Sequence, residues 1–350
     1  MTGVAASETR GRRFVHGGVA EVKLTARCDQ RCVFCKSPAD AANRLDPEAA
    51  LARFPDLAER ARLLTLSGGE ATLVPELEQV VSGARAAGFR RVELQTNGMA
   101  LDRPGLAGSL RAAGLTNVLV SLHAHEPGLS DRLTGTPGGF ARTLEGIDQA
   151  AAAGLQISLC HVICQGNVSH IEAFADHVRA RFAGQPLQVV FTLAIPTYRV
   201  RQQPGLMPSL EQVAPPLRAA LDRFVPARAP LSSHLGGAGR ALARGRAALA
   251  SREGPVGRLT RRVGHLATPP ERWRRRHRAR IIAHCGLPVC ILDSRAPFHD
   301  EWWWRDPAPA VDELIHPPAC ESCRRRERCS GLWRVYVERF GSDGLSPIAG

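Results

Sequence analysis

Between residues 19 and 197 there are six short β-rich runs, and each is followed along the chain by an amphipathic segment of helical length. Such alternation is typical of βα units, whose right-handed crossovers place the strands in one parallel sheet with helices outside. We therefore predict an α/β fold in which six units form a partial (β/α)6 barrel. The predicted strands span residues 20–26, 63–68, 91–97, 117–123, 156–163 and 187–195, and the predicted helices 47–61, 75–88, 103–114, 140–154, 170–182 and 208–224.

A cluster of three cysteines directly follows the first predicted strand. The stretch CDQRCVFC places Cys28, Cys32 and Cys35 within eight residues, with Phe34 just before the third cysteine. Ligands of parallel sheets and barrels bind at the C-terminal ends of the strands. The three thiols are therefore predicted to lie at the edge of the barrel where chemistry takes place.

Three close thiols could form a disulfide with one spare, a zinc knuckle or an incomplete iron-sulfur site. The first twenty residues contain no apolar signal-peptide core, and no run of 18 apolar residues occurs, so we expect a cytoplasmic protein without a membrane span. In a reducing compartment, clustered cysteines more often bind metal than form disulfides. Zinc needs a fourth ligand, and none is close in sequence. Three thiolates can instead bind three irons of a four-iron cluster and leave the fourth iron open.

The CxxxCxxC spacing after the first strand of a βα array resembles the radical S-adenosylmethionine (radical SAM) superfamily. The resemblance covers about residues 19–197. It implies a [4Fe-4S] cluster on Cys28, Cys32 and Cys35, whose open iron binds S-adenosylmethionine. In that family an electron from the cluster cleaves the cofactor to methionine and a 5′-deoxyadenosyl radical, which abstracts a substrate hydrogen. An external one-electron donor of the flavodoxin or ferredoxin type is also implied.

Further matches to this family lie at the ends of the next strands. The stretch LSGGEAT resembles its GGE motif, which implies that a carboxylate and two glycines receive the methionyl ammonium. LQTNG and VSLHA end the third and fourth strands, where the family often contacts the ribose and the methionyl carboxylate. The implied cofactor-binding residues are Gly68, Gly69, Glu70, Gln95, Asn97 and Ser121, together with Phe34 near the adenine. Read alone, SGGE and QTNG could be plain tight turns.

Other polar residues near these strand ends have simpler interpretations. His123 and His125 could serve a metal or proton transfer, but capping histidines are more common, and we leave them out of the predicted site. Cys160 and Cys164 have even spacing and would face the same side of the fifth strand. One could donate a hydrogen atom or accept a substrate, yet buried cysteines usually act as small apolar residues.

A second set of cysteines lies near the C-terminus. CxxC is followed by a third cysteine after five residues, and HCGLPVC lies thirty residues upstream; this spacing suits zinc or a full four-iron cluster. The run CESCRRRERCSGLW resembles the twitch or SPASM extension of radical SAM enzymes. Where the longer, two-cluster form would have another cysteine, this chain has Trp333. The resemblance implies one auxiliary [4Fe-4S] cluster on Cys290, Cys320, Cys323 and Cys329, with Cys285 as a possible substitute; a structural zinc ribbon is the alternative.

Charge and composition divide the rest of the chain. The net charge is +13, and residues 237–280 alone carry thirteen Arg against two Glu. This segment could bind an acidic peptide or nucleic acid, but a solvated basic face is the simpler interpretation. We expect an N-terminal tail over residues 1–18, the barrel core over 19–225, a linker or excursion rich in Arg, Ala, Pro and Gly over 226–280 with one helix near 270–280, and a cluster-binding domain over 281–350.

Three functions remain open from the sequence. A second, fully ligated cluster would accept or supply an electron after hydrogen abstraction, which favours a net oxidation. The first hypothesis is therefore a maturase that oxidatively modifies a ribosomally made peptide, by crosslinking for instance, or epimerises it. The second is a radical SAM oxidoreductase or epimerase acting on a small metabolite. The third is a non-catalytic zinc protein that binds nucleic acid, a partner we disfavour because it leaves the GGE-like turn unexplained.

Overall fold

A computed structural model describes residues 15–16, 19–36, 47–224, 279–281, 286–299 and 312–349. Its central feature is an eight-stranded sheet in which the strands lie in sequence order. The first strand pairs antiparallel with the second, and every later pair is parallel. The strands are β1 (Val15–His16), β2 (Val19–Thr25), β3 (Leu63–Gly68), β4 (Arg91–Thr96), β5 (Asn117–Ser121), β6 (Gln156–Ile163), β7 (Leu187–Leu193) and β8 (Ala279–Ile281).

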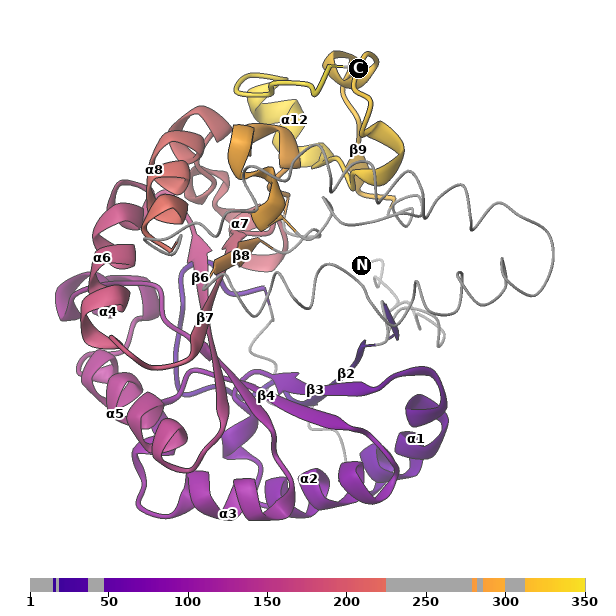
Figure 1. The fold of residues 1–350 in the computed structure, drawn as a ribbon, viewed down its shortest axis with the longest axis vertical. Coiled ribbons are helices and arrows are strands. Elements are labelled where there is room, and N and C mark those ends of the chain that lie inside the picture. The colour runs from indigo at the N-terminus through magenta and orange to yellow at the C-terminus, as the bar shows by residue number, and fades with distance from the viewer. Residues whose placement is uncertain are drawn as a thin grey trace, which may run out of the picture.

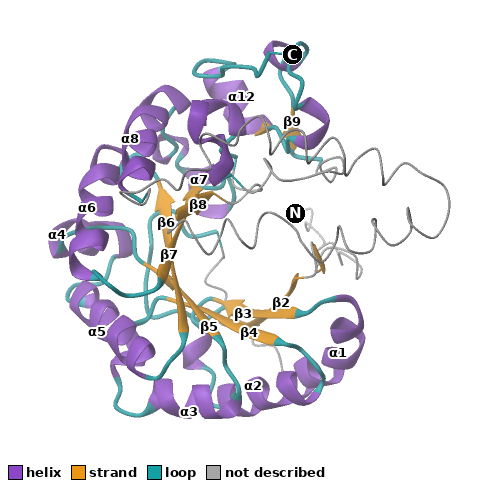
Figure 2. Cartoon of the chain, in the orientation of Figure 1, coloured by secondary structure: helices purple, strands orange, loops and turns teal. Residues whose placement is uncertain are grey.

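The helices that connect the strands lie on the outside of this curved sheet. Figures 1 and 2 show them as an outer arc that follows the strands from β2 to β8, as expected for a partial barrel. The helices are α1 (Pro47–Arg60), α2 (Leu77–Ala86), α3 (Leu106–Ala113), α4 (Pro127–Thr134), α5 (Gly139–Ala152), α6 (Ile171–Arg181), α7 (Tyr198–Gln202) and α8 (Leu210–Arg223).

All six predicted strands and the six predicted helices through residue 224 are confirmed, with ends shifted by a few residues. The structure adds α4 and α7, which are short and lie within the loops after β5 and β7. The helix predicted near residues 270–280 is wrong for its last two residues, because residues 279–281 form the strand β8, which pairs with β7. Residues 225–278 lie outside the described residues. The parallel sheet therefore continues beyond residue 225, where the sequence predicted that the core ends.

Side chains alternate between two faces along each strand. On β2, Val22 and Leu24 are buried in the main core between sheet and helices, whereas Glu21 and Lys23 face the other way. The inner face of the barrel is consequently polar at its first strands. Ser67 donates to Glu21 at 2.5 Å and Thr65 to Glu93 at 3.3 Å.

The described C-terminal residues form a small unit at one end of the arc. It contains a 3₁₀ segment (Val289–Phe298), a two-stranded sheet of β9 (Leu314–Ile315) and β10 (Leu332–Trp333), and the helix α12 (Arg334–Phe340). Figure 1 shows this unit beside α8. The buried hydroxyl of Tyr336 accepts a hydrogen bond from the backbone N–H of Leu210, at 2.6 Å. Because Leu210 is the first residue of α8, this bond satisfies one of the free N–H groups at the helix start.

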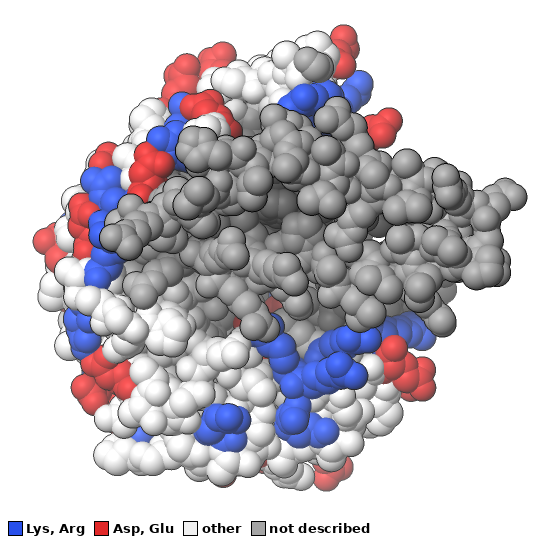
Figure 3. Space-filling view, in the orientation of Figure 1, with Lys and Arg blue, Asp and Glu red and all other residues white. Residues whose placement is uncertain are grey.

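Charged side chains cover the outside of the molecule unevenly. In Figure 3, Lys and Arg gather over the part that holds α1, α2 and β2–β4 in Figure 1. Arg62, Arg90 and Arg91 are exposed at the starts of β3 and β4. The described residues include no helix that has both the length and the apolar character needed to cross a bilayer.

Candidate active site

The loop with the three predicted cluster ligands leaves β2 and crosses the C-terminal ends of the neighbouring strands. Its first contact is with the GGE turn after β3. Gly69 donates from its backbone N–H to the carbonyl of Thr25 at 2.6 Å, and Glu70 donates to that of Arg27 at 2.7 Å. A Cβ atom on Gly69 would lie 2.1 Å from the Arg27 carbonyl oxygen, and one on Gly68 would lie 2.3 Å from that of Thr25.

These contacts give the two glycines a role that the sequence did not indicate. From the resemblance to the GGE motif, we predicted that these glycines let a ligand come close to the backbone. In the structure they allow the backbone of residues 68–70 to pack directly against the start of the cysteine loop. The two motifs therefore position each other.

The end of β4 makes the second contact with the cysteine loop. Asn97 donates from Nδ2 to a carboxylate oxygen of Asp29 at 2.6 Å, while its Oδ1 accepts from the backbone N–H of Met99 at 2.9 Å. Asp29 follows Cys28 directly. Asn97, predicted to contact the cofactor, thus uses its side chain to hold the loop between the first two cysteines.

The carboxylate of Glu70 joins the GGE turn to the end of β4 through hydrogen bonds. Its Oε1 accepts from the backbone N–H of Thr72 at 3.0 Å and from the hydroxyls of Thr72 and Thr96 at 2.6 and 2.7 Å. Its Oε2 accepts from the backbone N–H of Asn97 at 2.6 Å. All of these donors are neutral, and no described Lys or Arg forms an ion pair with the carboxylate.

Burial makes this carboxylate electrostatically unusual. Glu70 is 1% exposed, and desolvation raises its pKa, although the hydrogen bonds from Asn97 and Thr72 act in the opposite direction. A buried carboxylate without a cationic partner is costly unless a positive group comes close. The site therefore suits a ligand that carries an ammonium group.

The three thiols differ in exposure. Cys28 is exposed, whereas Cys32 and Cys35 are half-buried, and the N–H of Cys35 donates to the carbonyl of Cys32. Desolvation raises the pKa of Cys28 to about 11, with smaller contributions from the charges of Glu70, Asp29 and Cys35. Desolvation likewise raises the pKa of Cys32 to about 12, and the thiols of Cys28 and Cys35 add to this shift. The thiols of the trio therefore lie near enough to affect one another's pKa, but they are not arranged around one point as metal ligands. Within the described ranges, no three His, Cys, Asp or Glu side chains are grouped so that they could hold a metal ion.

The far end of the loop lies over β5 and β6. The N–H groups of Arg31 and Val33 donate to the carbonyls of Thr134 and Leu133, at the end of α4. Phe34 is buried and meets the ring of His123 edge to face, with ring centroids 4.7 Å apart. Ser121 ends β5, two residues before His123.

The other residues considered in the sequence analysis lie partly near the site and partly in the core. Gln95 is half-buried on the inner face of β4, two residues before Asn97. Cys160 lies opposite Ser121 in the sheet, and Cys164 is buried in a second apolar cluster with Phe34. His125 stacks on His170, with ring centroids 5.3 Å apart.

Sequence reasoning missed Asp29, Thr72 and Thr96, and it set His123 aside. Asp29 and Thr96 lie beside predicted residues, so their position could have suggested them. Their partners could not be known, because the Asp29–Asn97 bond joins residues that are 68 positions apart.

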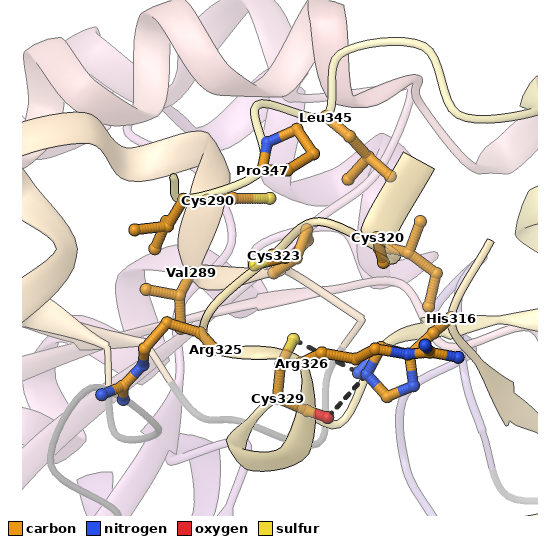
Figure 4. Close-up of a pocket in the computed structure, with 14 residues that line it drawn as sticks. Val289, Cys290, His316, Cys320, Cys323, Arg325, Arg326, Cys329, Leu345 and Pro347 are labelled. Atoms are coloured by element: carbon orange, nitrogen blue, oxygen red, sulfur yellow. Dashed lines mark hydrogen bonds between the residues drawn. The ribbon is translucent and has the colours of Figure 1, made fainter. Parts of the chain in front are cut away.

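The second set of cysteines also comes together. Cys290, Cys320, Cys323 and Cys329 line one pocket in the C-terminal unit, and Figure 4 shows them around it together with His316 and Arg325. Desolvation raises the pKa of Cys290 to about 11, and the thiols of Cys320 and Cys323 contribute to this shift. Three of the four thus lie near one another, although 30 residues separate Cys290 from Cys320.

Backbone groups support the fourth cysteine of this pocket. The N–H of Gly331 donates to Sγ of Cys329 at 3.4 Å, and His316 donates from Nε2 to the carbonyl of Cys329 at 2.9 Å. Trp333 packs against Gly286, where a Cβ atom would lie 2.5 Å from the indole ring. Cys285, the possible substitute ligand, lies outside the described residues.

Comparison with known proteins identifies the first part of the chain. Residues 22–178 match the family model described as the radical SAM superfamily. They contain the cysteine trio, the GGE turn and the ends of β4 and β5. This chain has a radical SAM domain. The radical SAM family implies S-adenosylmethionine and a [4Fe-4S] cluster as cofactors, and the predicted family resemblance is confirmed.

Similar proteins carry out different reactions. The chain is 31% identical over 160 residues to a probable GTP 3′,8-cyclase of Sulfolobus acidocaldarius, a match that covers 44% of this chain and 50% of that protein. It is 30% identical over 194 residues to a PqqA peptide cyclase of Ruegeria pomeroyi, with 54% and 51% covered. The chain thus spans about half the length of the curated relatives that it matches.

A solved structure supports the fold. The chain resembles the structure described as native anSMEcpe with bound AdoMet and Cp18Cys peptide, with a TM-score of 0.50 and 14% sequence identity. The similarity covers 59% of each chain. The partial-barrel α/β fold predicted from the alternation of strands and helices is therefore confirmed.

Proposed function

We propose that this radical SAM enzyme catalyses a net oxidative modification of a peptide. Cys28, Cys32 and Cys35 would hold the [4Fe-4S] cluster, and the open iron would bind S-adenosylmethionine. When bound, these cofactors supply a 5′-deoxyadenosyl radical that abstracts a substrate hydrogen. The observation that carries the proposal is the convergence of the cysteine loop, Glu70 and the ends of β3–β5 in one site.

The residues of the site fit a zwitterionic ligand with an ammonium group. Oε2 of Glu70 accepts one hydrogen bond in the structure, so it retains acceptor capacity for such a group. Gly68 and Gly69 leave the turn free of side chains, and Gln95 and Ser121 lie on the inner face of the next two strands. In the proposal, Glu70 receives the methionyl ammonium, Asn97 holds the cysteine loop through Asp29, and Phe34 packs near the adenine.

The C-terminal cysteines support the oxidative part of the proposal. An auxiliary [4Fe-4S] cluster would be bound by Cys290, Cys320, Cys323 and Cys329. In this proposal residues 281–350 form the cluster-binding domain. The barrel core comprises residues 19–225 together with β8. Four cysteine ligands leave no open iron, so such a cluster suits electron transfer. It could take up the electron that a substrate radical loses when a product is oxidised.

A peptide is the favoured substrate because of how far the similarity extends. The matches to two PqqA peptide cyclases run over 194 and 219 residues, whereas the match to the GTP 3′,8-cyclase runs over 160. A small metabolite is the second candidate. Incubation of the reduced enzyme with candidate precursor peptides should give products two mass units lighter, and exclusive turnover of a small molecule would contradict the peptide assignment.

Metal analysis tests the proposed cofactors directly. The wild-type protein and a variant with Cys28, Cys32 and Cys35 changed to Ala are reconstituted anaerobically with iron and sulfide. We expect about eight irons in the wild type and about four in the variant, because each four-iron cluster has its own cysteine set. About four irons falling to none would leave the C-terminal site to zinc or empty, and zinc alone would overturn the enzyme assignment.

A single substitution separates the two cysteine sets. Cys32→Ala should abolish reductive cleavage of S-adenosylmethionine, measured as 5′-deoxyadenosine, while about four irons remain on the C-terminal cysteines. Dithionite and a flavodoxin or ferredoxin serve as alternative electron donors in the same assay. Retained cleavage in Cys32→Ala would contradict the assignment of the trio.

A further inference from the structure

A group of basic side chains lies around the loop that carries the cysteine trio. Arg27 and Arg31 are exposed on the loop itself, and Lys36 is exposed directly after Cys35. We call these three residues the loop cations. Cys28 lies between the first two along the chain and is also exposed. The loop cations therefore bring positive charge to the part of the surface where a thiol of the predicted cluster site meets solvent.

A fourth cation reaches this loop from the segment after β7. Arg199 lies in α7 and donates from Nη1 to the carbonyl of Arg31 at 3.5 Å. Desolvation dominates the pKa of Cys32, but the positive charge of Arg199 acts on the same thiol in the opposite direction. The basic surface therefore extends from the loop to the neighbouring helix.

Acidic side chains close to the loop already have partners. Asp29 accepts the hydrogen bond from Asn97, and Asp102 forms an ion pair with Arg142. The pKa of Arg142 is raised by its hydrogen bond with Asp102 and further by the charge of Asp29, so both acids lie near one guanidinium. None of the loop cations forms an ion pair within the part of the chain that the structure describes. Their charge can therefore act on a partner from outside.

The backbone of the loop is fixed to the barrel at both ends. The carbonyl of Arg27 accepts from the backbone N–H of Glu70, and the N–H groups of Arg31 and Val33 donate to the end of α4. A Cβ atom on Gly135 would lie 3.2 Å from Cβ of Arg31, so the loop also packs closely against the residue after α4. A fixed arrangement of charges favours one orientation of a charged partner over others.

The chemistry of the site gives this basic surface a specific use. A run of charges is more often only solvated, and charge alone would not identify a partner. The proposed function, however, requires one external electron for each cleavage of S-adenosylmethionine, and the rate of electron transfer falls steeply with distance. An electron carrier must therefore dock where the cluster ligands come close to the surface. The exposed thiol of Cys28 lies among the loop cations and meets this condition.

We propose that the loop cations and Arg199 form the docking surface for an acidic protein that carries a one-electron centre near its own surface. This inference rests on the proposed function, because it requires a [4Fe-4S] cluster on the trio. One electron passes from the centre of the partner, which is oxidised, to this cluster, which is reduced, and no bond forms or breaks. Opposite charges would steer the two proteins together and set their orientation.

Three double variants separate local docking from a general effect of charge. Arg31→Gln with Lys36→Gln, the neutral pair, removes two charges beside the trio. Arg62→Gln with Arg90→Gln, the control pair, removes two exposed charges at the other ends of the strands, because these residues directly precede β3 and β4. The length of β3, about 20 Å, separates the control pair from the GGE turn. Arg31→Lys with Lys36→Arg, the charge-keeping pair, tests for damage to the loop.

An acidic flavodoxin that carries FMN is the probe. Its dissociation constant is measured on each anaerobically reconstituted protein at low salt, together with the iron content. We expect the neutral pair to bind flavodoxin about two- to thirtyfold more weakly, as expected for the loss of two exposed charge contacts. The control pair and the charge-keeping pair should bind like the wild type. At about 0.5 M salt the difference should shrink, because salt screens exposed charges.

The outcomes distinguish docking from the proposed function. Failure of the wild type to bind flavodoxin, equal affinity of the wild type and the neutral pair, or an equal loss in the control pair would overturn the inference. An equal loss in the charge-keeping pair would also overturn it, since charge would then not be the cause. Dithionite reduces the cluster without docking. A wild type that cleaves no S-adenosylmethionine even with dithionite would therefore overturn the proposed function instead.

Discussion

The side-chain amide of Asn97 holds the carboxylate of Asp29 at 2.6 Å, and so the end of β4 is tied to the loop that carries the cysteine trio. The same asparagine donates from its backbone N–H to Glu70. One residue therefore links the predicted cluster loop to the carboxylate that is predicted to bind the cofactor.

This link can be measured with a double-mutant cycle on Asn97→Ala and Asp29→Ala. Each single variant should bind less iron at the trio than the wild type, because the loop between Cys28 and Cys32 loses its attachment to β4. The double variant should be little worse than either single one, since both changes remove the same bond. Iron and sulfide content after reconstitution, with the C-terminal cysteines changed to Ala, gives the readout. Fully additive losses would mean that the two side chains act independently.

Gly69→Ala tests the close approach between the GGE turn and the cysteine loop. Because the new Cβ atom would lie 2.1 Å from the carbonyl oxygen of Arg27, we expect a loss of about 2 kcal/mol or more in the free energy of unfolding. Gly108→Ala is the control, as it lies within α3 with no atom within 4 Å of the added carbon. It should leave the protein unchanged or stabilise it by about 0.5–1 kcal/mol. Urea unfolding of both variants distinguishes them, and equal stability would contradict the packing described for Gly69.

Tyr336→Phe tests how the C-terminal unit is attached to α8. The variant leaves the buried N–H of Leu210 without its acceptor, so we expect a destabilisation of about 1–3 kcal/mol. Hydrogen exchange at Leu210, compared with the central residues of α8, should show the loss locally. Protection equal to that of the wild type would mean that water replaces the hydroxyl.

Alkaline pH should weaken the same attachment. Burial raises the pKa of Tyr336 from 10.0 to about 12. A folded-state pKa above the unfolded one contributes stability that is complete below pH 10 and is lost as the pH rises toward 12. Tyr336→Phe should remove this part of the pH dependence, and an identical alkaline profile in both proteins would contradict it.

The buried histidines predict sensitivity to acid. Desolvation lowers the pKa of His123 and of His161 from 6.5 to about 3. The unfolded chain therefore binds more protons than the folded one between pH 6.5 and 3, so stability is present above pH 6.5 and decreases as the pH falls. Between pH 7 and 5 each buried imidazole should cost roughly 2 kcal/mol. Thermal unfolding of the wild type and His123→Asn measures this, and parallel pH profiles would exclude a contribution from His123.

The sequence by itself determined the order of strands and helices, and it predicted both cysteine sets. Runs such as residues 63–68 and 156–163 match β3 and β6 residue for residue, because short β-rich runs between amphipathic helical segments leave little choice of structure. The spacing of Cys28, Cys32 and Cys35 is local, so it needed no fold to be recognised. Where local signals were weak, as in α4, α7 and β8, the sequence prediction missed the element or was wrong.

Only the tertiary structure decided which of these residues meet. The approach of Gly69 to Arg27, the Asp29–Asn97 bond and the contact of Phe34 with His123 all depend on how neighbouring strands end relative to one another. Cys290 joins Cys320, Cys323 and Cys329 only because the C-terminal unit folds back over 30 residues. Such contacts form between segments far apart in the chain, and periodicity carries no information about them. They arise from the register of the sheet and the packing of its loops.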